Sequence, residues 1–407
     1  MSIRKCDSFV KFKAGDNLNH LNTLMHLCIS RFKFEPEVLS GKKAIYVWTL
    51  ERNRMKKVRV GIVGAGGYGG CGAVELLTRH PGAEVAVLVD TQDVGRPMSE
   101  MYPHLNGFCD MVIKSPDDPD MPKDLDVVLF ATPDGVGQKG APFWLENGTK
   151  VVDYSGDFRF NDADTYKGYA SRIGRTQEHA SPQLLSESVY GLAELHRDEI
   201  RKSRLVGNPG CFAVSCILGL TPALAERIIE PDSIICDAKT GISGAGKNPK
   251  PTWHFPARYE TMNAYKISGH QHVYEIEREL SRVAGRDITI TFTPHAIPLC
   301  RGILSTIYAD LKPGLTAKTI EEAYRGFYNK DAFVRVFGPD KPQMSVYMRG
   351  TNFCNLSINV DERTNKLIVV SLIDNLVKGQ AGSAVQNLNL MCGLDETEGL
   401  MHPGIYP

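Results

Sequence analysis

The fold is decided by the stretch Val58-Arg59-Val60-Gly61-Ile62-Val63-Gly64-Ala65-Gly66-Gly67-Tyr68-Gly69. In its first half, apolar and polar residues alternate and an apolar run follows, which is typical of a buried parallel strand. Its second half matches G-x-G-x-x-G, and residues 73–80 continue with a helical pattern. A strand, a glycine turn and a helix in this order predict a dinucleotide-binding unit, because glycines let a pyrophosphate approach the helix N-terminus. The expected contacts are Gly64, Gly66, Gly67, Tyr68 and Gly69.

The next predicted strand, residues 84–89, ends at Asp90. An acidic residue about 20 positions after the glycines binds a ribose 2′-hydroxyl and repels a 2′-phosphate. On residue chemistry alone, Asp90 therefore indicates NAD rather than NADP.

Residues 126–131 and 150–153 read as further parallel strands, and strands and helical patterns alternate to about residue 207. This alternation predicts an α/β fold with a doubly wound, Rossmann-type sheet. The loop 132–135 follows one of these strands, at the carboxyl edge where a nicotinamide would lie. Pro133 is the candidate cofactor contact in this loop.

A turn, Asn208-Pro209-Gly210, precedes Cys211 and an apolar run that predicts a helix to about residue 229. Unpaired N–H groups and the positive dipole end at a helix N-terminus lower the pKa of a thiol. We therefore expect Cys211 to be a nucleophile. The competing interpretation is a buried apolar cysteine, since the chain has ten cysteines.

Beyond this helix the strand-like runs are more widely spaced and rich in β-branched residues, which predicts a second, α+β domain with a mixed sheet. A loop of small residues containing Ser243 and Gly244 offers backbone donors to a cofactor. Helices are expected at 273–283 and 381–391. The strand-like runs are 233–238, 288–292, 303–308 and 356–360.

His270 and His272 stand at the start of the helix 273–283, and either one could move the proton of a reacting thiol. On one helix, residues two apart do not face the same way, so at most one of them should meet Cys211. A thiol, a histidine and a dinucleotide fold together predict reduction of an activated acyl group through a thioester. Backbone N–H groups, including that of Cys211, would stabilise the resulting oxyanion.

Composition excludes several other classes of protein. Lys and Arg number 47 and Asp and Glu also 47, so nothing indicates nucleic acid or an anionic membrane as a partner. No C-x-x-C occurs, so neither a zinc site nor a disulfide framework is expected, and the simplest setting is the cytoplasm. No apolar run approaches the roughly 20 residues that span a bilayer. Residues 1–54 are interpreted as a dispensable extension or a misassigned upstream start.

From about residue 56 to 400, the chain resembles the N-acetyl-γ-glutamyl-phosphate reductases of the aspartate-semialdehyde dehydrogenase superfamily. Many motifs in the right order carry this resemblance. They are Asp157-Phe158-Arg159, Val189-Tyr190-Gly191-Leu192, Asn208-Pro209-Gly210-Cys211, Ser243-Gly244-Ala245-Gly246, Gly269-His270-Gln271-His272, Thr293-Pro294-His295, Arg301-Gly302-Ile303-Leu304, Gly350-Thr351-Asn352-Phe353-Cys354 and Gly393-Leu394-Asp395-Glu396-Thr397.

The resemblance implies reduction of a small acyl phosphate, N-acetylglutamyl 5-phosphate, to its semialdehyde with NADPH in arginine biosynthesis. It implies Cys211 as nucleophile, His272 as acid/base and Asn375 near the nicotinamide. It also implies a homodimer or homotetramer, with a nucleotide domain of residues 55–210 and 375–407 and a catalytic domain of residues 211–374. Asn208, Arg159, His270 and Glu275 are the further candidates for binding substrate.

The chain departs from the family pattern at three points. Asp90-Thr91 replaces a frequent Ser-Arg, which leaves NAD(H) open beside NADP(H). Asp134 stands where a histidine is common, and Val-Tyr-Glu replaces Thr-Pro-Glu after His272, with Glu275 retained. Two other readings remain open at this point. One is a sister aminoadipyl-phosphate reductase of lysine biosynthesis, and the other is a non-catalytic dinucleotide-binding sensor.

Overall fold

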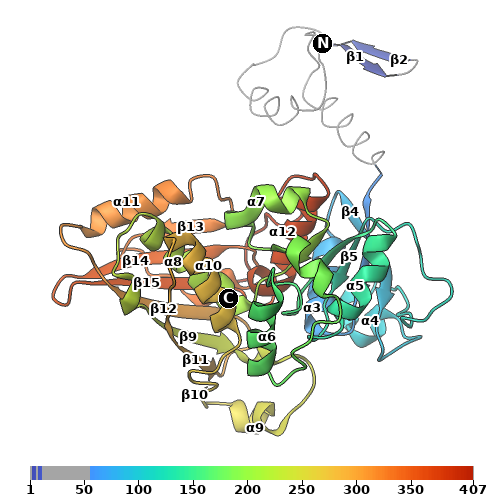
Figure 1. Ribbon diagram of the computed structural model, residues 1–407. Helices are drawn as coiled ribbons and strands as arrows, with labels where there is room; N and C mark the ends of the chain where they lie inside the picture. The colour runs from blue at the N-terminus through green and yellow to red at the C-terminus, as the bar shows by residue number, and fades with distance from the viewer. Residues whose placement is uncertain (1, 6–7, 12–55, 407) are drawn as a thin grey trace. The chain divides into compact units, whose positions relative to one another are not determined.

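Figure 1 shows the computed structural model, which describes residues 2–5, 8–11 and 56–406. The chain forms two units, Met1–Lys57 and Val58–Pro407, and each is described by itself. In the first unit, β1 (Ser2–Lys5) and β2 (Ser8–Lys11) pair antiparallel. The prediction about residues 1–54 otherwise lies outside the described residues.

The second unit begins with a six-stranded parallel sheet in the order β4-β3-β5-β6-β8-β7. The predicted doubly wound α/β fold is therefore confirmed. Its strands are β3 (Val58–Val63), β4 (Ala83–Val89), β5 (Val127–Phe130), β6 (Lys150–Asp153), β7 (Val189–Tyr190) and β8 (Leu205–Gly207). Its main helices are α3 (Tyr68–Leu77), α5 (Gly137–Glu146), α6 (Ala163–Arg172) and α7 (Ala193–Lys202).

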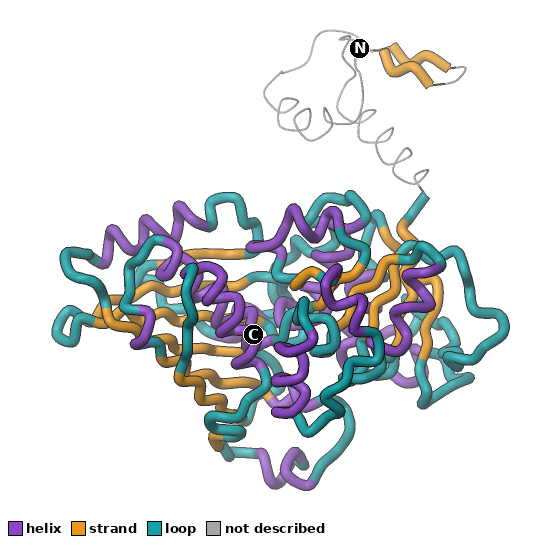
Figure 2. Tube along the Cα trace, viewed as in Figure 1, coloured by secondary structure: helices purple, strands orange, loops and turns teal. Residues whose placement is uncertain are grey.

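A seven-stranded mixed sheet follows, in the order β10-β11-β9-β12-β15-β14-β13, and confirms the predicted second sheet. Two of its pairs, β11–β9 and β13–β14, are parallel and the others are antiparallel. Figure 2 shows the strands of the two sheets as separate runs within this unit. The strands are β9 (Ile235–Gly241), β10 (Asn263–Ala264), β11 (Thr291–Ile297), β12 (Ile303–Asp310), β13 (Val334–Phe337), β14 (Cys354–Asp361) and β15 (Lys366–Ile373).

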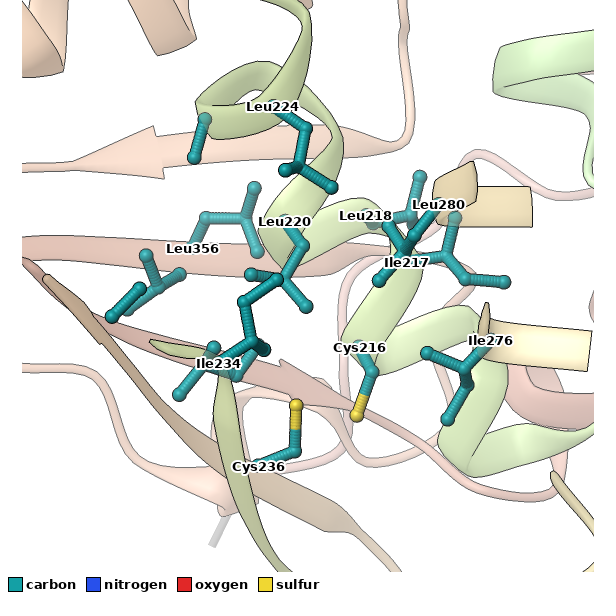
Figure 3. Packing of buried hydrophobic residues seen from close by; sticks show 14 of the residues in the cluster. Cys216, Ile217, Leu218, Leu220, Leu224, Ile234, Cys236, Ile276, Leu280 and Leu356 are labelled. Carbon is teal, nitrogen blue, oxygen red and sulfur yellow. The ribbon is translucent and has the colours of Figure 1, made fainter. Parts of the chain in front are cut away.

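Helix α8 (Cys211–Ala225) lies at the centre of the core beneath the mixed sheet. It is apolar on all sides, and every residue from Phe212 to Leu224 is buried. Figure 3 shows Cys216 and Leu220 of α8 among Cys236 of β9 and Ile276 of α10 (His272–Ala284). The helix ends four residues before the predicted end. Helices α9 (Phe255–Arg258) and α11 (Ala317–Phe327) complete this region.

The chain then returns to the parallel sheet. A π-helix, η7 (Val377–Ala381), leads into α12 (Gly382–Met391), all of whose residues are buried. Figure 1 shows α12 near α7, and α12 packs against both α3 and α7. Val385 and Leu388 share a core with Val60 and Leu129 of the parallel sheet. Among the described residues, no helix is long and apolar enough to cross a membrane.

Candidate functional site

A cavity of about 1620 Å³ runs from the glycine turn before α3 to the turn before α8. Segments of both sheets line it, and most of the residues predicted from sequence meet there. Those that line it are Gly64, Gly67, Tyr68, Gly69, Asp90, Pro133, Arg159, Cys211, Ser243, Gly244, His270, His272 and Asn375. Three predicted residues do not line the cavity, namely Gly66, Asn208 and Glu275. They make hydrogen bonds to its lining segments, which are described below.

The glycine turn has the shape that a pyrophosphate requires. Gly64 has a φ of +83°, which favours glycine, and a Cβ on Gly70 would lie 2.4 Å from the Gly64 carbonyl oxygen. Helix α3 therefore starts at Tyr68, closer to the turn than its apolar pattern predicts. No side chain caps this helix start, so its N–H groups are open to an anion. The turn fits a dinucleotide.

Asp90 holds the turn in place. Its carboxylate accepts hydrogen bonds from the backbone N–H groups of Gly66 (2.9 Å), Thr91 (2.8 Å) and Gln92 (3.1 Å). Tyr102 donates from its hydroxyl to the Gly66 carbonyl at 2.9 Å. The role of Asp90 in this structure is thus to order the loop as well as to place a negative charge beside the cavity.

Cys211 is the first residue of α8 and is partly buried. Burial raises the pKa of its thiol to about 11, and this outweighs the lowering by the Phe212 N–H and the Arg159 guanidinium. The expectation that the helix N-terminus alone lowers this pKa is wrong, because the sequence does not reveal how far the thiol is withdrawn from water. In this state Cys211 is a neutral thiol at neutral pH.

Both histidines line the cavity, because α10 begins at His272 and His270 precedes it. The two histidines were expected to lie on one helix and to face different ways. This is wrong, because only His272 belongs to α10. The two imidazole rings meet edge to face, with centroids 4.7 Å apart. The backbone N–H of His272 donates to Nδ1 of His270 at 3.2 Å. His272 Nε2 lies 2.5 Å from where a Cβ on Gly210 would be, directly beside the residue before Cys211.

The two imidazoles are neutral. Burial first, then the charge of Arg159, holds the pKa of His272 well below its usual value. Burial, then His272, lowers the pKa of His270 to about 2. A neutral imidazole has a lone pair that can accept a proton, and the lowered pKa values make both rings weak bases in this state.

Glu275 fixes the turn that presents Cys211. It is fully buried and accepts from Arg159 Nη1 (2.9 Å), the Tyr190 hydroxyl (2.8 Å) and the Gly210 N–H (3.0 Å). Arg159 Nε in turn donates to the carbonyl of Asn208 at 2.8 Å. The hydrogen bonds of these predicted substrate residues are made to the protein itself.

The π-helix η7 brings residues to the cavity that the motif analysis missed. A Cβ on Gly379 would lie 2.6 Å from Cys211 Cβ, so only glycine permits this approach. Neighbouring Lys378 is fully buried and paired with Glu194 at 2.6 Å. Asn375 donates from Nδ2 to Ser243 Oγ at 3.0 Å, which joins the start of this segment to the small-residue loop. Lys378 is the only charged residue between Asp374 and Asp395, and this was the signal available in the sequence.

Known proteins match both halves of the second unit. A family model described as the NAD binding domain of semialdehyde dehydrogenase matches residues 59–203, and one described as its dimerisation domain matches residues 211–375. The N-acetyl-gamma-glutamyl-phosphate reductase of Syntrophobacter fumaroxidans is 42% identical over 343 residues, which cover 84% of this chain and 98% of the relative. That of Desulforudis audaxviator is 44% identical over 352 residues, covering 86% and 100%.

The chain belongs to the N-acetyl-gamma-glutamyl-phosphate reductase family. The resemblance inferred from the motifs is confirmed. In fold, the chain is also similar to aspartate semialdehyde dehydrogenase II of Vibrio cholerae, with a TM-score of 0.63 and 15% identity over 83% of this chain and 99% of that one. The Candida albicans aspartate semialdehyde dehydrogenase with NADP gives a TM-score of 0.59 at 16% identity, covering 83% and 99%.

The departure of this reductase at Asp134 has a structural explanation. The Asp134 carboxylate accepts from the Gly156 N–H at 2.8 Å and from the Tyr169 hydroxyl at 2.7 Å. Asp134 is not among the residues that line the cavity, whereas its neighbours Pro133 and Gly135 are. Asp134 therefore anchors the loop from outside the cavity.

The departure at Asp90 is accompanied by a lysine that the motif analysis missed. Lys247 lines the cavity, just after η4 (Ile242–Ala245). Its Nζ lies 3.3 Å from where a Cβ on Gly66 would be and 3.4 Å from Asp93 Oδ2. A cation of this reductase thus stands next to the loop that Asp90 holds.

Proposed function

We propose that the protein reduces N-acetyl-γ-glutamyl phosphate to N-acetylglutamate 5-semialdehyde and phosphate, with NADPH as the reductant. The observation that carries this is the meeting of Cys211, His272 and the glycine turn in one cavity. We assign the cofactor to residues 55–210 with 375–407 and the chemistry to residues 211–374. Membership of the reductase family supports the choice of substrate.

In the first half of the reaction, the Cys211 sulfur attacks the acyl carbon while His272 takes the thiol proton. The bond from the acyl carbon to the phosphate oxygen breaks, and phosphate departs. The acyl group is then a thioester on Cys211. Glu275 and Arg159 keep the turn fixed during this step, because they bind Gly210 and Asn208. They are positioning residues in this scheme.

When bound, the nicotinamide cofactor supplies the hydride that reduces the thioester. Backbone N–H groups at the start of α8 are placed to stabilise the oxyanion of the resulting thiohemiacetal. When its C–O⁻ group returns to a carbonyl, the C–S bond breaks and the sulfur recovers its proton from His272. The products are the semialdehyde and the enzyme in its starting state.

NADP(H) is the cofactor we propose, in spite of Asp90. The carboxylate of Asp90 accepts three backbone N–H donors, which offset part of its charge toward the cavity. Lys247 offers a cation beside the same loop, and a lysine binds phosphate as a point charge. These two features favour a 2′-phosphate over a bare ribose.

The test is phosphate-dependent oxidation of N-acetylglutamate 5-semialdehyde, measured with NADP⁺ and with NAD⁺. We expect turnover with NADP⁺, and we expect Cys211→Ser to abolish it while cofactor binding persists, since an alcohol ionises far less than a thiol. The matched control is Cys300→Ser, which replaces an exposed cysteine. Near-normal turnover of Cys211→Ser would refute the covalent route. Activity confined to the aminoadipyl substrate would indicate the reductase of lysine biosynthesis. The absence of turnover with either cofactor would indicate a non-catalytic sensor.

We also propose that the protein is a homodimer or a dimer of dimers, assembled through the mixed sheet. The family model for residues 211–375 is described as a dimerisation domain. The face of the sheet opposite α8 carries the partly exposed Tyr308 and Ile368 and the exposed Ile235, which pair across neighbouring strands. The proposed setting is the reducing cytoplasm, since eight cysteines of the described part are free thiols.

A further inference from the structure

Three side chains of the types that bind metals converge beside α3. Cys71 and Glu75 are four residues apart on this helix and so share a face. His104 reaches them from η1 (Pro103–Leu105). Glu75 Oε1 lies 2.8 Å from His104 Nε2 and 3.9 Å from Cys71 Sγ, and the three ligand atoms lie within 4.8 Å of one another.

These separations suit a tetrahedral divalent cation. Bonds of about 2.0–2.3 Å to nitrogen, oxygen and sulfur place neighbouring ligand atoms about 3.3–3.8 Å apart. The sulfur-to-oxygen distance of 3.9 Å lies just above this range, and the nitrogen-to-oxygen distance of 2.8 Å needs to open by about 0.5 Å. The His104 side chain is 54% exposed, so a rotation toward solvent can make this adjustment.

The ligand types select the cation. Thiolate and imidazole favour Zn²⁺ and its neighbours in the transition series, whereas Mg²⁺ and Ca²⁺ prefer an all-oxygen set. A cysteine that binds a metal does so as a thiolate, so binding releases the thiol proton of Cys71.

We propose that Cys71, Glu75 and His104 form a binding site for a zinc-like divalent cation that ties η1 to α3. A search for C-x-x-C spacing does not detect this set, because one ligand comes from a separate loop. The site adjoins the cofactor loop, since Tyr102 packs edge to face against His104 and donates to the Gly66 carbonyl. The proposal concerns structure and does not rest on the proposed reaction.

The experiment is a titration of the full-length protein with Co²⁺, followed by competition with Zn²⁺. We expect a thiolate-to-cobalt absorption band that saturates at one equivalent, the release of one proton, and loss of the band on addition of Zn²⁺. Cys71→Ser should remove the band, and His104→Ala should weaken binding at least about tenfold.

The control is Cys211→Ser, because the catalytic thiol and its histidines form a second conceivable site. The band should persist in this variant. No band in the unaltered protein would overturn the proposal, and so would a band that Cys211→Ser removes and Cys71→Ser leaves. If Cys71→Ser does not fold, the half-exposed His104 decides, and unchanged Co²⁺ affinity in His104→Ala contradicts the proposed site.

Discussion

The surroundings of Cys211 keep its thiol protonated in the free protein. Its thiol pKa is raised to about 11, and the pKa of His272 is depressed. A thiolate–imidazolium pair would need the opposite shifts, a lowered thiol pKa and a raised imidazole pKa. In the proposed reaction the thiolate is therefore formed in the course of the attack, and the neutral thiol resists oxidation before it.

This arrangement predicts the pH dependence of alkylation. Since a raised thiol pKa leaves little thiolate at neutral pH, the rate of Cys211 alkylation by iodoacetamide should rise about tenfold per pH unit from about pH 7 to 10. Site-resolved mass spectrometry measures it, with the exposed Cys300 as internal comparison. A rate that levels off below about pH 8 would show a preformed thiolate instead.

In the proposed function, the choice of cofactor depends on Lys247. We expect Lys247→Ala to weaken NADP⁺ binding by about 10- to 100-fold and to leave NAD⁺ binding nearly unchanged, because a hydrogen bond to a charged group contributes about 1.5–3 kcal/mol. Fluorescence titration of both cofactors gives the ratio. Lys312→Ala is the matched control, since Lys312 does not line the cavity. An equal loss for both cofactors would place Lys247 at the pyrophosphate instead.

At the scale of elements, a buried ion pair between Lys378 and Glu194 holds the π-helix η7 against α7. The side chains of Lys378 and Glu194 are 0% and 1% exposed, and Gln386 accepts a second hydrogen bond from Lys378 at 2.8 Å. A π-turn inside a helix is uncommon and often marks a functional site. Here it presents Gly379 to Cys211.

Removing one partner of this pair should therefore be costly. Lys378→Met leaves Glu194 buried without its partner, and we expect the free energy of unfolding to fall by about 3–5 kcal/mol. Urea denaturation measures this, with the exposed Lys318→Met as control.

The same ion pair makes stability depend on pH. Burial raises the pKa of Glu194, but Lys378 and Gln386 outweigh it and lower the value below 4.5. The contribution of Glu194 to stability is thus present above pH 4.5 and is lost as the pH falls through the lowered pKa. A loss of stability under about 1 kcal/mol would contradict this account.

Several strands and helices were predicted from their own residues, but β15 was not, and neither were the contacts between distant segments. The strand 150–153 has the same bounds in the structure, and 84–89 differs from β4 by one residue. Helix α3 begins five residues early, because glycines hide the helical pattern. The roles of Glu275 and Lys378 depend on partners 65 to 184 residues away, and no local pattern records these partners.

At the scale of the whole molecule, the open face of the mixed sheet predicts the assembly. The register places Tyr308 opposite Ile235 on one side and Ile368 on the other, and alternate residues of β12 are buried beneath α8. Tyr308→Arg should shift the protein toward monomer in light scattering, because it puts a charge into an apolar contact. Phe108→Arg, at a residue 73% exposed in the loop after η1 and outside the mixed sheet, should leave the assembly unchanged. A Tyr308→Arg protein of unaltered mass would exclude this face.

The return of α12 to the parallel sheet has a consequence for biosynthesis. The strands β3, β4 and β5 end by Phe130, whereas α12, the helix that shares their core, spans residues 382–391 and is synthesised long after them. The nascent chain thus carries an incomplete apolar surface until residue 391 has left the ribosome, and such a surface favours chaperone binding. Folding of the parallel-sheet half is coupled to the synthesis of α12, so a chain truncated shortly before residue 382 contains Cys211 but lacks part of the core beside α3.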